Sequence, residues 1–468
     1  PAREPPGHAG RGLGAGRAPA ARRAARLSVA SAARRGALVV LGRVAQGRPL
    51  APALEKTAVG LADVRDRALV HELVLGTLRR RGWLDHVLAR LSSRPLDTLN
   101  PAVCDALRLG VYQLLFLRTP AHAAVSETVD LAREREPHAA GFVNAILRRL
   151  QREGPPPEAD PASDPVGWMS TAGSLPRWLA ERWHARLGPA DALARTRAAL
   201  EAPPTFVRLN PRVASARDEL ARGGVELTAC EVPGAFRASQ GALGVFAERG
   251  FVYVQDAGSQ LVALLAATQG RVLDACAAPG GKALLLSDLA EGATRVVAAE
   301  ASLKRLASMA TLARRWGATR LLLLGADALR PPFRGDFDAV LLDAPCSGLG
   351  TLARNPDIRW RMTPQDVERH AARQRSLIES TARLVRPGGR LVYATCSLEA
   401  EETHQVVNAF LAANPAFGLD ELPDWARPLA REGRVELDPA RHPGDGFFAV
   451  RLRRGTLISP RLMRPPKP

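Results

Sequence analysis

From residue 271 onward, short apolar runs alternate with stretches of helical periodicity. The apolar runs lie at 271–274, 296–299, 320–324, 337–342 and 389–393. Nearly continuous apolar runs that are separated by helical stretches are typical of parallel strands buried on both faces. This part of the chain is therefore predicted to be an α/β domain with a doubly wound parallel sheet.

The N-terminal part has a different pattern, with apolar residues recurring at three- and four-residue steps from about residue 28 to residue 152. These positions are Leu69, Val70, Leu73, Val74, Thr77, Leu78, Leu107, Val111, Leu114 and Leu115. The spacing predicts an all-α unit. Arginines gather between the apolar stripes at 79–81, 108 and 148–149. Such a basic unit is expected to dock a polyanion, and the alternative is a scaffold that only packs on the α/β domain.

Composition shifts divide the chain further. The proline-rich stretch 153–166 is expected to be a linker, and 167–250 a small α+β module in which Arg208 and Asn210 either face RNA or are ordinary strand-end polar groups. The α/β domain is predicted at 251–454. The ends, 1–27 and 455–468, are expected to be basic tails, the first of them disordered.

The charge of the chain indicates its partner. Its 468 residues carry a net charge of +18, and a basic balance of this size favours a polyanion such as RNA. The five cysteines show neither C-x-x-C spacing nor clustered histidines, so we expect no metal and a reducing cytoplasm. Apolar runs are too short for a membrane span.

Candidate chemistry lies at the ends of the predicted strands. The first strand runs into a loop made of Cys276, Ala277, Ala278, Pro279, Gly280, Gly281 and Lys282. The glycines permit close backbone approach to a ligand, and a helix is expected to begin near Ala283. The loop matches neither the dinucleotide fingerprint nor the Walker loop. Glu300 ends the next strand, where an acidic residue holds a ribose diol, so a nucleoside-bearing ligand is expected.

Two cysteines, Cys346 and Cys396, follow later strands, and Asp343 ends the strand before Cys346. Thiols at the carboxyl edge of a parallel sheet suggest covalent catalysis by one and a separate task for the other. The residues alone do not decide which is the nucleophile. Cys104, Cys230 and Cys276 are expected to be small packing residues.

Taken together, the motifs at 276–282, 343–348, 355–357, 393–397 and 444–448 resemble those of the Sun-type RNA 5-methylcytosine methyltransferases. The stretches 72–79, 107–117 and 142–149 extend the resemblance to the bacterial 16S ribosomal RNA cytosine-C5 methyltransferases with a NusB-like N-terminal domain. The resemblance implies a Rossmann-like class I domain that uses S-adenosylmethionine, an all-α NusB-like domain and a small RRM-like module.

The resemblance also implies roles for individual residues. Residues 276–282 would bind S-adenosylmethionine together with Glu300 at the ribose hydroxyls, Asp327 near the adenine amino group, and Asp343. Cys396 would be the nucleophile that attacks C6 of cytosine, and Cys346 would serve product release. Asp343 would also contact the N3/N4 edge of the flipped base. Relatives often have Asp in place of Glu300 and Thr in place of Ala283, which affects only the detail of the cofactor contacts.

The sequence therefore predicts a cytoplasmic monomer that methylates 16S rRNA, unassembled or early in assembly, and takes part in rRNA processing. The alternative with the same chemistry is a tRNA cytosine-C5 methyltransferase. A second alternative, a non-catalytic NusB-like RNA-binding factor, is disfavoured because such a protein has no use for two thiols beside a glycine loop. A third, methylation of a small molecule or protein, is disfavoured because it does not need the large basic N-terminal part.

Overall fold

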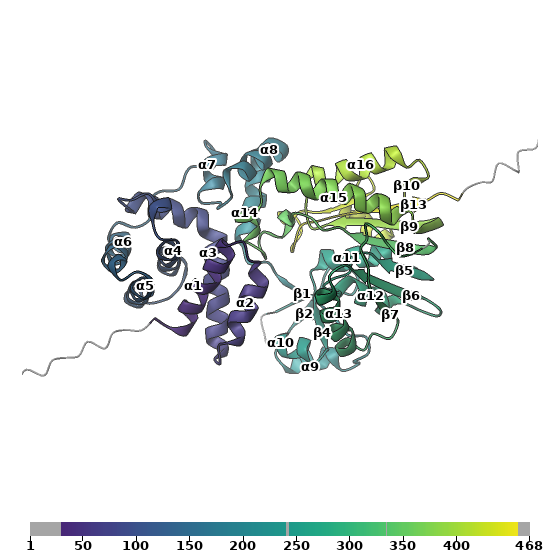
Figure 1. Ribbon diagram of the computed structural model, residues 1–468, viewed down its shortest axis with the longest axis horizontal. Helices are drawn as coiled ribbons and strands as arrows, with labels where there is room; N and C mark the ends of the chain where they lie inside the picture. The colour runs from purple at the N-terminus through teal and green to yellow at the C-terminus, as the bar shows by residue number, and fades with distance from the viewer. Residues whose placement is uncertain (1–29, 240–242, 334, 457–468) are drawn as a thin grey trace, which may run out of the picture.

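The computed structural model describes residues 30–239, 243–333 and 335–456 (Figure 1). The tail expected at 1–27 lies outside the described residues, and so does all but the first two residues of the tail expected at 455–468. Among the described helices, none combines the length and apolarity that crossing a membrane requires.

Helices form the N-terminal part, drawn in purple and blue in Figure 1. They are α1 (Ala32–Ala45), α2 (Leu50–Val59), α3 (Val64–Leu91), α4 (Pro101–Phe116), α5 (Ala121–Arg135) and α6 (Ala140–Glu153), with the 3-10 turns η1 (Leu96–Thr98) and η2 (Pro137–Ala139). Asp63 and Asn100 cap α3 and α4 by accepting a backbone hydrogen bond. The predicted all-α architecture is confirmed, and its periodic residues Leu73, Val74 and Leu107 are buried.

The next two helices pack on the same apolar core. They are α7 (Pro165–Ser170) and α8 (Arg177–Leu200), and α8 is kinked at Gly188, where φ is 75°. Trp168, Leu179 and Trp183 join the core of the N-terminal helices. The division at 153–166 stays a prediction of domain limits, but α7 and α8 lie with the N-terminal helices by their packing.

A small antiparallel sheet follows, with strand order β2-β3-β1-β4. Its elements are β1 (Thr205–Leu209), α9 (Ala216–Arg222), β2 (Leu227–Ala229), β3 (Phe236–Ala238), α10 (Leu243–Glu248) and β4 (Val252–Val254). Arg208 is buried, forms an ion pair with Asp288, and stacks 4.5 Å above the Trp316 ring. Asn210 donates to the carbonyls of Gly250 and Trp316. Both side chains are buried, as expected of internal polar groups, and both join this module to the next.

The larger sheet has the order β11-β12-β13-β9-β8-β5-β6-β7, and β10 pairs with β13. Its strands are β5 (Arg271–Asp274), β6 (Arg295–Glu300), β7 (Leu321–Gly325), β8 (Phe337–Asp343), β9 (Val385–Thr395), β10 (Phe417–Leu419), β11 (Ala430–Arg431), β12 (Arg434–Leu437) and β13 (Phe447–Arg454). The five strands predicted from the apolar runs are parallel neighbours, whereas β13 is antiparallel to β9.

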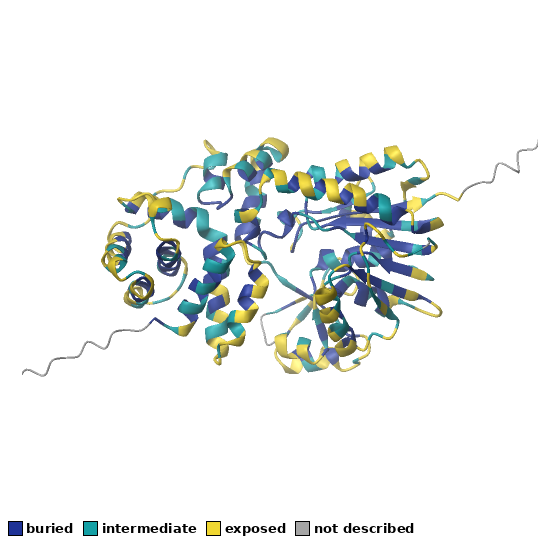
Figure 2. Cartoon of the chain, viewed as in Figure 1, coloured by how far each residue is buried: buried dark blue, intermediate teal, exposed yellow. Residues whose placement is uncertain are grey.

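Helices cover both faces of this sheet. They are α11 (Ala257–Ala266), α12 (Gly281–Leu289), α13 (Leu303–Trp316), α15 (Pro364–Ala382) and α16 (His404–Ala413), with the 3-10 turns η4 (Ala400–Glu402) and η5 (Asp424–Leu429). The turn η3 (Leu349–Thr351) and the short helix α14 (Ile358–Arg361) lie instead against the N-terminal helices. In Figure 1, α15 and α16 lie above the sheet and α11 and α12 below it. Val272 packs toward α11 and Leu273 toward α15, which explains why the strands are apolar throughout and dark blue in Figure 2.

The segment 349–362, which comprises η3 and α14 and precedes α15, enters the core of the N-terminal helices. Leu349, Leu352 and Ile358 belong to that core. Arg359 is fully buried and donates to the carbonyls of Arg79, Ser174, Ala199 and Leu352. One guanidinium therefore ties α3, the α7–α8 pair and the catalytic domain together.

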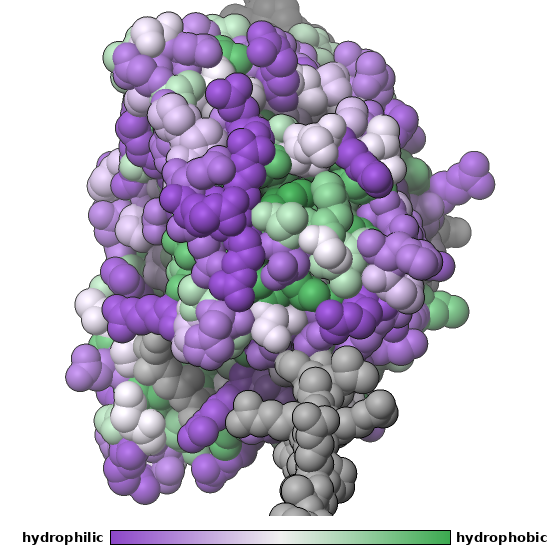
Figure 3. All heavy atoms as spheres, turned by 90° about the vertical axis from the view of Figure 1, so that its left-hand side faces the viewer, coloured by the Kyte–Doolittle hydropathy of each residue, from purple (hydrophilic) through white to green (hydrophobic). Residues whose placement is uncertain are grey.

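Several of the arginines that form the N-terminal basic clusters are occupied by internal contacts. Arg79 donates to the carbonyl of Ala353, Arg81 stacks on Trp360, and Arg108 is paired with Asp85 and Asp105. Figure 3 faces the N-terminal helices and shows hydrophilic side chains around an apolar area. Any RNA contact by this part must therefore come from other basic residues on its surface.

We expect Arg359→Ala to lower the free energy of unfolding by at least about 2 kcal/mol, because it leaves several buried carbonyl groups without a donor. Arg361→Ala is the matched control from the same short helix. Its ion pair with Asp357 is partly exposed and should contribute less than about 1 kcal/mol. Chemical denaturation of both variants measures the difference, and equal losses would contradict the structural role of Arg359.

Candidate active site

The functional side chains predicted from the sequence come to one edge of the parallel sheet. Strands β5, β6 and β8 end at Asp274, Glu300 and Asp343, and Asp327 follows β7 by two residues. Cys396 directly follows β9. Since these strands are parallel neighbours, their carboxyl ends open on the same side of the sheet.

The loop 276–282 leads from β5 into α12. Gly280 adopts a left-handed conformation with φ of 113°, and α12 begins at Gly281, two residues before the expected start. A Cβ at Gly281 would lie 2.6 Å from the Tyr253 ring, so only glycine permits this approach. Arg305 donates to the carbonyl of Ala278 and fixes the loop from α13. Cys276 is half-buried, and burial, followed by the charge of Asp274, raises its pKa to about 12.

A cavity of about 250 Å³ opens between this loop and the ends of β6, β7 and β8. Its walls include Cys276, Glu300, Asp327, Asp343, Cys346 and Cys396. Glu300 is largely buried and accepts a hydrogen bond from the Ser302 N–H at 2.8 Å. Asp327 accepts one from the Leu329 N–H at 3.0 Å. Both carboxylates retain acceptor capacity toward the cavity, which fits a ligand with hydroxyl and amino donors.

Asp274 is a site residue that the sequence reasoning missed. It is 1% exposed, and neither carboxylate oxygen accepts a hydrogen bond from the described residues. Burial raises its pKa to about 7, although the positive charge of Lys282 opposes this shift. A buried acid without a donor fits a cationic or hydrogen-bonding ligand beside the loop. Its signal in the sequence was its position, immediately before the glycine loop.

A second cavity, of about 390 Å³, lies on the other side of the loop and shares Cys276, Ala278, Asp343 and Cys396 with the first. Lys282 Nζ lies 2.6 Å from Asp343 Oδ2 between them. Burial opposes the charge of Lys282, but Asp343 and Asp274 outweigh it and raise the Lys282 pKa. Aromatic side chains also line the second cavity, namely Phe206, Tyr253 and Phe447.

Three charged residues at the second cavity were not predicted as site residues. Arg354 Nε lies 2.9 Å from Asp445 Oδ2, and its terminal nitrogen lies 3.3 Å from Asp256 Oδ2. Burial, followed by the charge of Asp256, raises the pKa of Asp445 to about 6 although Arg354 opposes this shift. In the sequence, Asp445 lies in the motif 444–448 and Arg354 directly precedes the motif 355–357. Their position in or beside a motif was the signal that could have identified these two residues.

The two thiols lie where the cavities meet. Cys346 Sγ and Cys396 Sγ are 3.2 Å apart, and both cysteines are free and half-buried. The hydrogen bond to Cys396, then burial, then the charges of Cys396, Glu402 and Asp343 raise the pKa of Cys346 well above its usual value. Cys396 lines both cavities, whereas Cys346 lines only the first.

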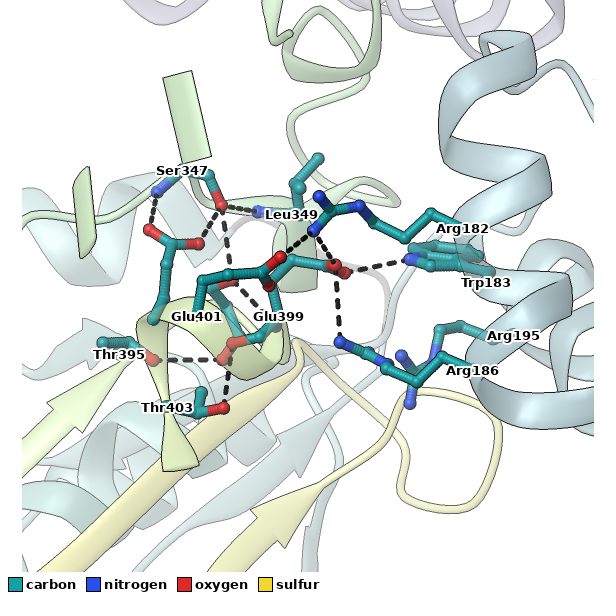
Figure 4. Close-up of polar contacts among 12 residues, drawn as sticks. Arg182, Trp183, Arg186, Arg195, Ser347, Leu349, Thr395, Glu399, Glu401 and Thr403 are labelled. Carbon is teal, nitrogen blue, oxygen red and sulfur yellow. Dashed lines mark hydrogen bonds and ion pairs between the residues drawn. The ribbon is translucent and has the colours of Figure 1, made fainter. Parts of the chain in front are cut away.

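The loop after Cys396 is held by helix α8 (Figure 4). Glu399 is 1% exposed and accepts hydrogen bonds from Trp183 Nε1 at 3.0 Å and from Arg182 at 3.2 Å. Arg186 completes the set at 3.4 Å. The loop after Cys396 is therefore held in place by the helical part of the chain.

Comparison with known proteins gives two family matches. Residues 261–453 match the family described as 16S rRNA methyltransferase RsmB/F, and residues 31–152 match the NusB family. The ribosomal RNA small subunit methyltransferase B of Xylella fastidiosa is 38% identical over 87% of this chain and 97% of its own length. A protein of Mycobacterium tuberculosis named as a methyltransferase is 40% identical over 84% of this chain and 89% of its own length.

Among solved structures, the crystal structure of PH0851 is similar, with a TM-score of 0.75 and 26% identity over 90% of this chain and 99% of that chain. The fold and the matches define a class I methyltransferase that uses S-adenosylmethionine. The chain belongs to the RsmB/F family of rRNA cytosine-C5 methyltransferases and carries the NusB-like domain that the sequence predicted.

Asp274→Asn should raise the free energy of unfolding of the cofactor-free protein above pH 7, by about 1–3 kcal/mol. The folded pKa of about 7 lies above the ordinary 3.8, so ionisation weakens the fold as pH rises through this interval. The gain should therefore shrink as pH falls toward 3.8. Chemical denaturation across this range measures it, and calorimetry should show weaker S-adenosylmethionine binding.

Asp338→Asn is the control. Asp338 lies near the start of β8, at the edge of the sheet opposite to Asp274. Burial alone would raise the pKa of Asp338, but hydrogen bonds from the Arg271 N–H and Arg386 outweigh burial and lower it. This variant should lose stability at neutral pH. A loss for Asp274→Asn as well would show that its carboxylate stabilises the empty fold.

Proposed function

We propose that this chain methylates C5 of a cytosine in 16S rRNA through a covalent adduct between Cys396 and C6 of the base. The observation that carries the proposal is the position of the thiols. They lie 3.2 Å apart beside Asp343, at the junction of a carboxylate-lined cavity and an aromatic-lined cavity. The names of the relatives that match most of the chain support 16S rRNA as the substrate.

The first cavity would hold S-adenosylmethionine, which supplies the methyl group when bound. The loop 276–282 would line the site, Glu300 would accept from the ribose hydroxyls, and Asp327 would accept from the adenine amino group. Cys276 and Ala278 of the loop line the first cavity with Glu300 and Asp327, and the free acceptor positions of the two carboxylates support these roles. Asp274, which lines the second cavity on the other side of the loop, would balance positive charge near the loop.

The second cavity would take the target base. Its aromatic side chains offer stacking surfaces for a base removed from its own stack. Asp343 would hydrogen-bond the N3/N4 edge, held in place by Lys282. A base in this cavity meets Cys396 and not Cys346, which supports Cys396 as the nucleophile.

Carbon 5 of cytosine is a weak nucleophile, and thiolate addition at C6 activates it. Cys396 would form the S–C6 bond while the C5–C6 π electrons shift toward C4 and N3, the edge that Asp343 would contact. C5 would then form its bond to the methyl carbon as the bond between that carbon and the sulfonium sulfur breaks, and S-adenosylhomocysteine would leave. Loss of the C5 proton to solvent restores the C5–C6 double bond as the S–C6 bond breaks. The Cys346 thiol would assist this release by donating a hydrogen bond to the departing sulfur.

The helical part would dock RNA, which its NusB match and the net charge of +18 support. We propose a monomer in the cytoplasm that acts on RNA unassembled or early in assembly.

Deletion of the gene should remove a single 5-methylcytosine from small-subunit rRNA, because the enzyme reads one docked position. Bisulfite sequencing of total RNA from the deletion strain and from a strain complemented with the Cys396→Ala protein provides the measurement. Loss confined to tRNA would contradict the ribosomal substrate and support the tRNA alternative.

Cys396→Ala should form no covalent RNA complex and no product, because C5 is never activated. Cys346→Ala should still attack and methylate but release slowly, so that an adduct stable to denaturing electrophoresis accumulates. The double variant should form none. Cys104→Ala, a buried cysteine outside the site, is the control and should behave like the unmodified protein.

An adduct with Cys396→Ala and none with Cys346→Ala would show that the roles of the two cysteines are the reverse of those proposed.

A target cytosine in stable duplex should react more slowly than an unpaired one, because the base must leave its stack.

A further inference from the structure

Glu402 is a buried carboxylate that the chemistry above does not use. It ends the η4 turn just after the Cys396 loop and is 0% exposed. One oxygen accepts from the Ser347 N–H at 2.8 Å and from Gln374 Nε2 at 3.1 Å, and the other contacts the Ser347 hydroxyl. Figure 4 shows the Ser347 amide and hydroxyl both engaged.

The donors that hold Glu402 are all neutral. Among the described residues, no lysine, arginine or histidine forms an ion pair with it, unlike Glu399 and Glu401 of the same loop. Neutral donors stabilise a buried carboxylate without cancelling its charge, and its field therefore acts strongly on nearby groups in this low-dielectric interior.

Glu402 reaches both cysteine loops through the serines that follow the thiols. Ser347 follows Cys346, and its hydroxyl lies 3.3 Å from that of Ser397, which follows Cys396. Gln374 also donates to the carbonyl of Pro345, so the residues on both sides of Cys346 are held. Gly350 N–H donates to the Cys396 carbonyl at 3.0 Å.

Charged and titratable groups face the thiol pair from every neighbouring element. Around the first cavity and Cys346 they are Cys276, Glu300, Arg305, Asp327, Asp343, Arg373, Tyr393 and Glu402, and around the second cavity and Cys396 they are Lys282, Asp256, Asp274, Arg354 and Asp445. The closest ion pair, Lys282 with Asp343, lies between the cavities on the Cys396 side. On the Cys346 side, Glu402 adds a negative charge that no ion pair offsets.

We propose that Glu402 is a positioning residue that keeps the proton on Cys346 and aligns the two cysteine loops, so that Cys396 accepts the hydrogen bond between the sulfurs and carries the thiolate. This assignment rests on the proposed roles of the two cysteines. It explains how two thiols in contact take different roles: a thiolate at Cys346 would be repelled by Glu402, whereas a thiol there stabilises the attacking and departing sulfur of Cys396.

Glu402→Gln is the test, since it removes the charge and retains the shape. Iodoacetamide labelling of the RNA-free protein, followed by peptide mass spectrometry, gives the pH midpoint of Cys346 alkylation. We expect the midpoint to fall by about one pH unit, which corresponds to roughly tenfold faster labelling below it. Methyl transfer should slow while S-adenosylmethionine affinity is unchanged.

Glu401→Gln is the matched control, because it removes a carboxylate from the same turn whose partner is Arg182. It should leave the Cys346 midpoint in place. Glu402→Asp keeps the charge and should also keep the midpoint high, even where its shorter side chain slows the reaction. Thermal unfolding confirms that each variant is folded.

An unchanged Cys346 midpoint in folded Glu402→Gln would overturn the proposal, and so would an equal shift in Glu401→Gln. The labelling uses neither RNA nor cofactor, so its outcome is independent of the substrate. Failure of the proposed function would instead appear in the adduct pattern of the two cysteine variants.

Discussion

The parallel register between β8 and β9 is the constraint on which the active site depends. It pairs Asp343 with Ala394, and the Ala344 N–H donates to the Ala394 carbonyl at 2.8 Å. Cys346 lies three residues beyond one member of the pair and Cys396 two beyond the other. Two loops of nearly equal reach therefore bring the sulfurs together, and a shift of one residue would turn these strand positions to the opposite face of the sheet.

The second constraint is the shared core. Segment 349–362 belongs by sequence to the catalytic domain, but its apolar side chains lie in the core of the N-terminal helices. Arg354, at the second cavity, and Arg359, in that core, come from the same short segment. The helical part is thus joined to the walls of the second cavity, and an isolated α/β domain would expose Leu349, Leu352 and Ile358 to water.

Buried carboxylates concentrate at the catalytic edge of the sheet. Asp274 has no donor among the described residues, and Glu402 is held by neutral groups only. Such groups weaken a fold unless a ligand or a reaction uses their charge. Apolar side chains pack on both faces of the surrounding strands, and this burial offsets the cost of the buried charges.

The sequence by itself determined the helical part, the α/β part, the polar residues at the ends of the parallel strands, and the family. It could do so because periodicity and short motifs are local properties of the chain. It also indicated which residues would gather at one sheet edge. Only the tertiary structure decided that Arg208 and Asn210 are internal and that Arg79, Arg81 and Arg108 have partners. It also decided that Asp274 and Arg354 line the second cavity and that Glu402 contacts Ser347 beside Cys346. Those outcomes depend on contacts between segments far apart in the chain, and burial and charge pairing across such contacts leave no periodic signal in the sequence.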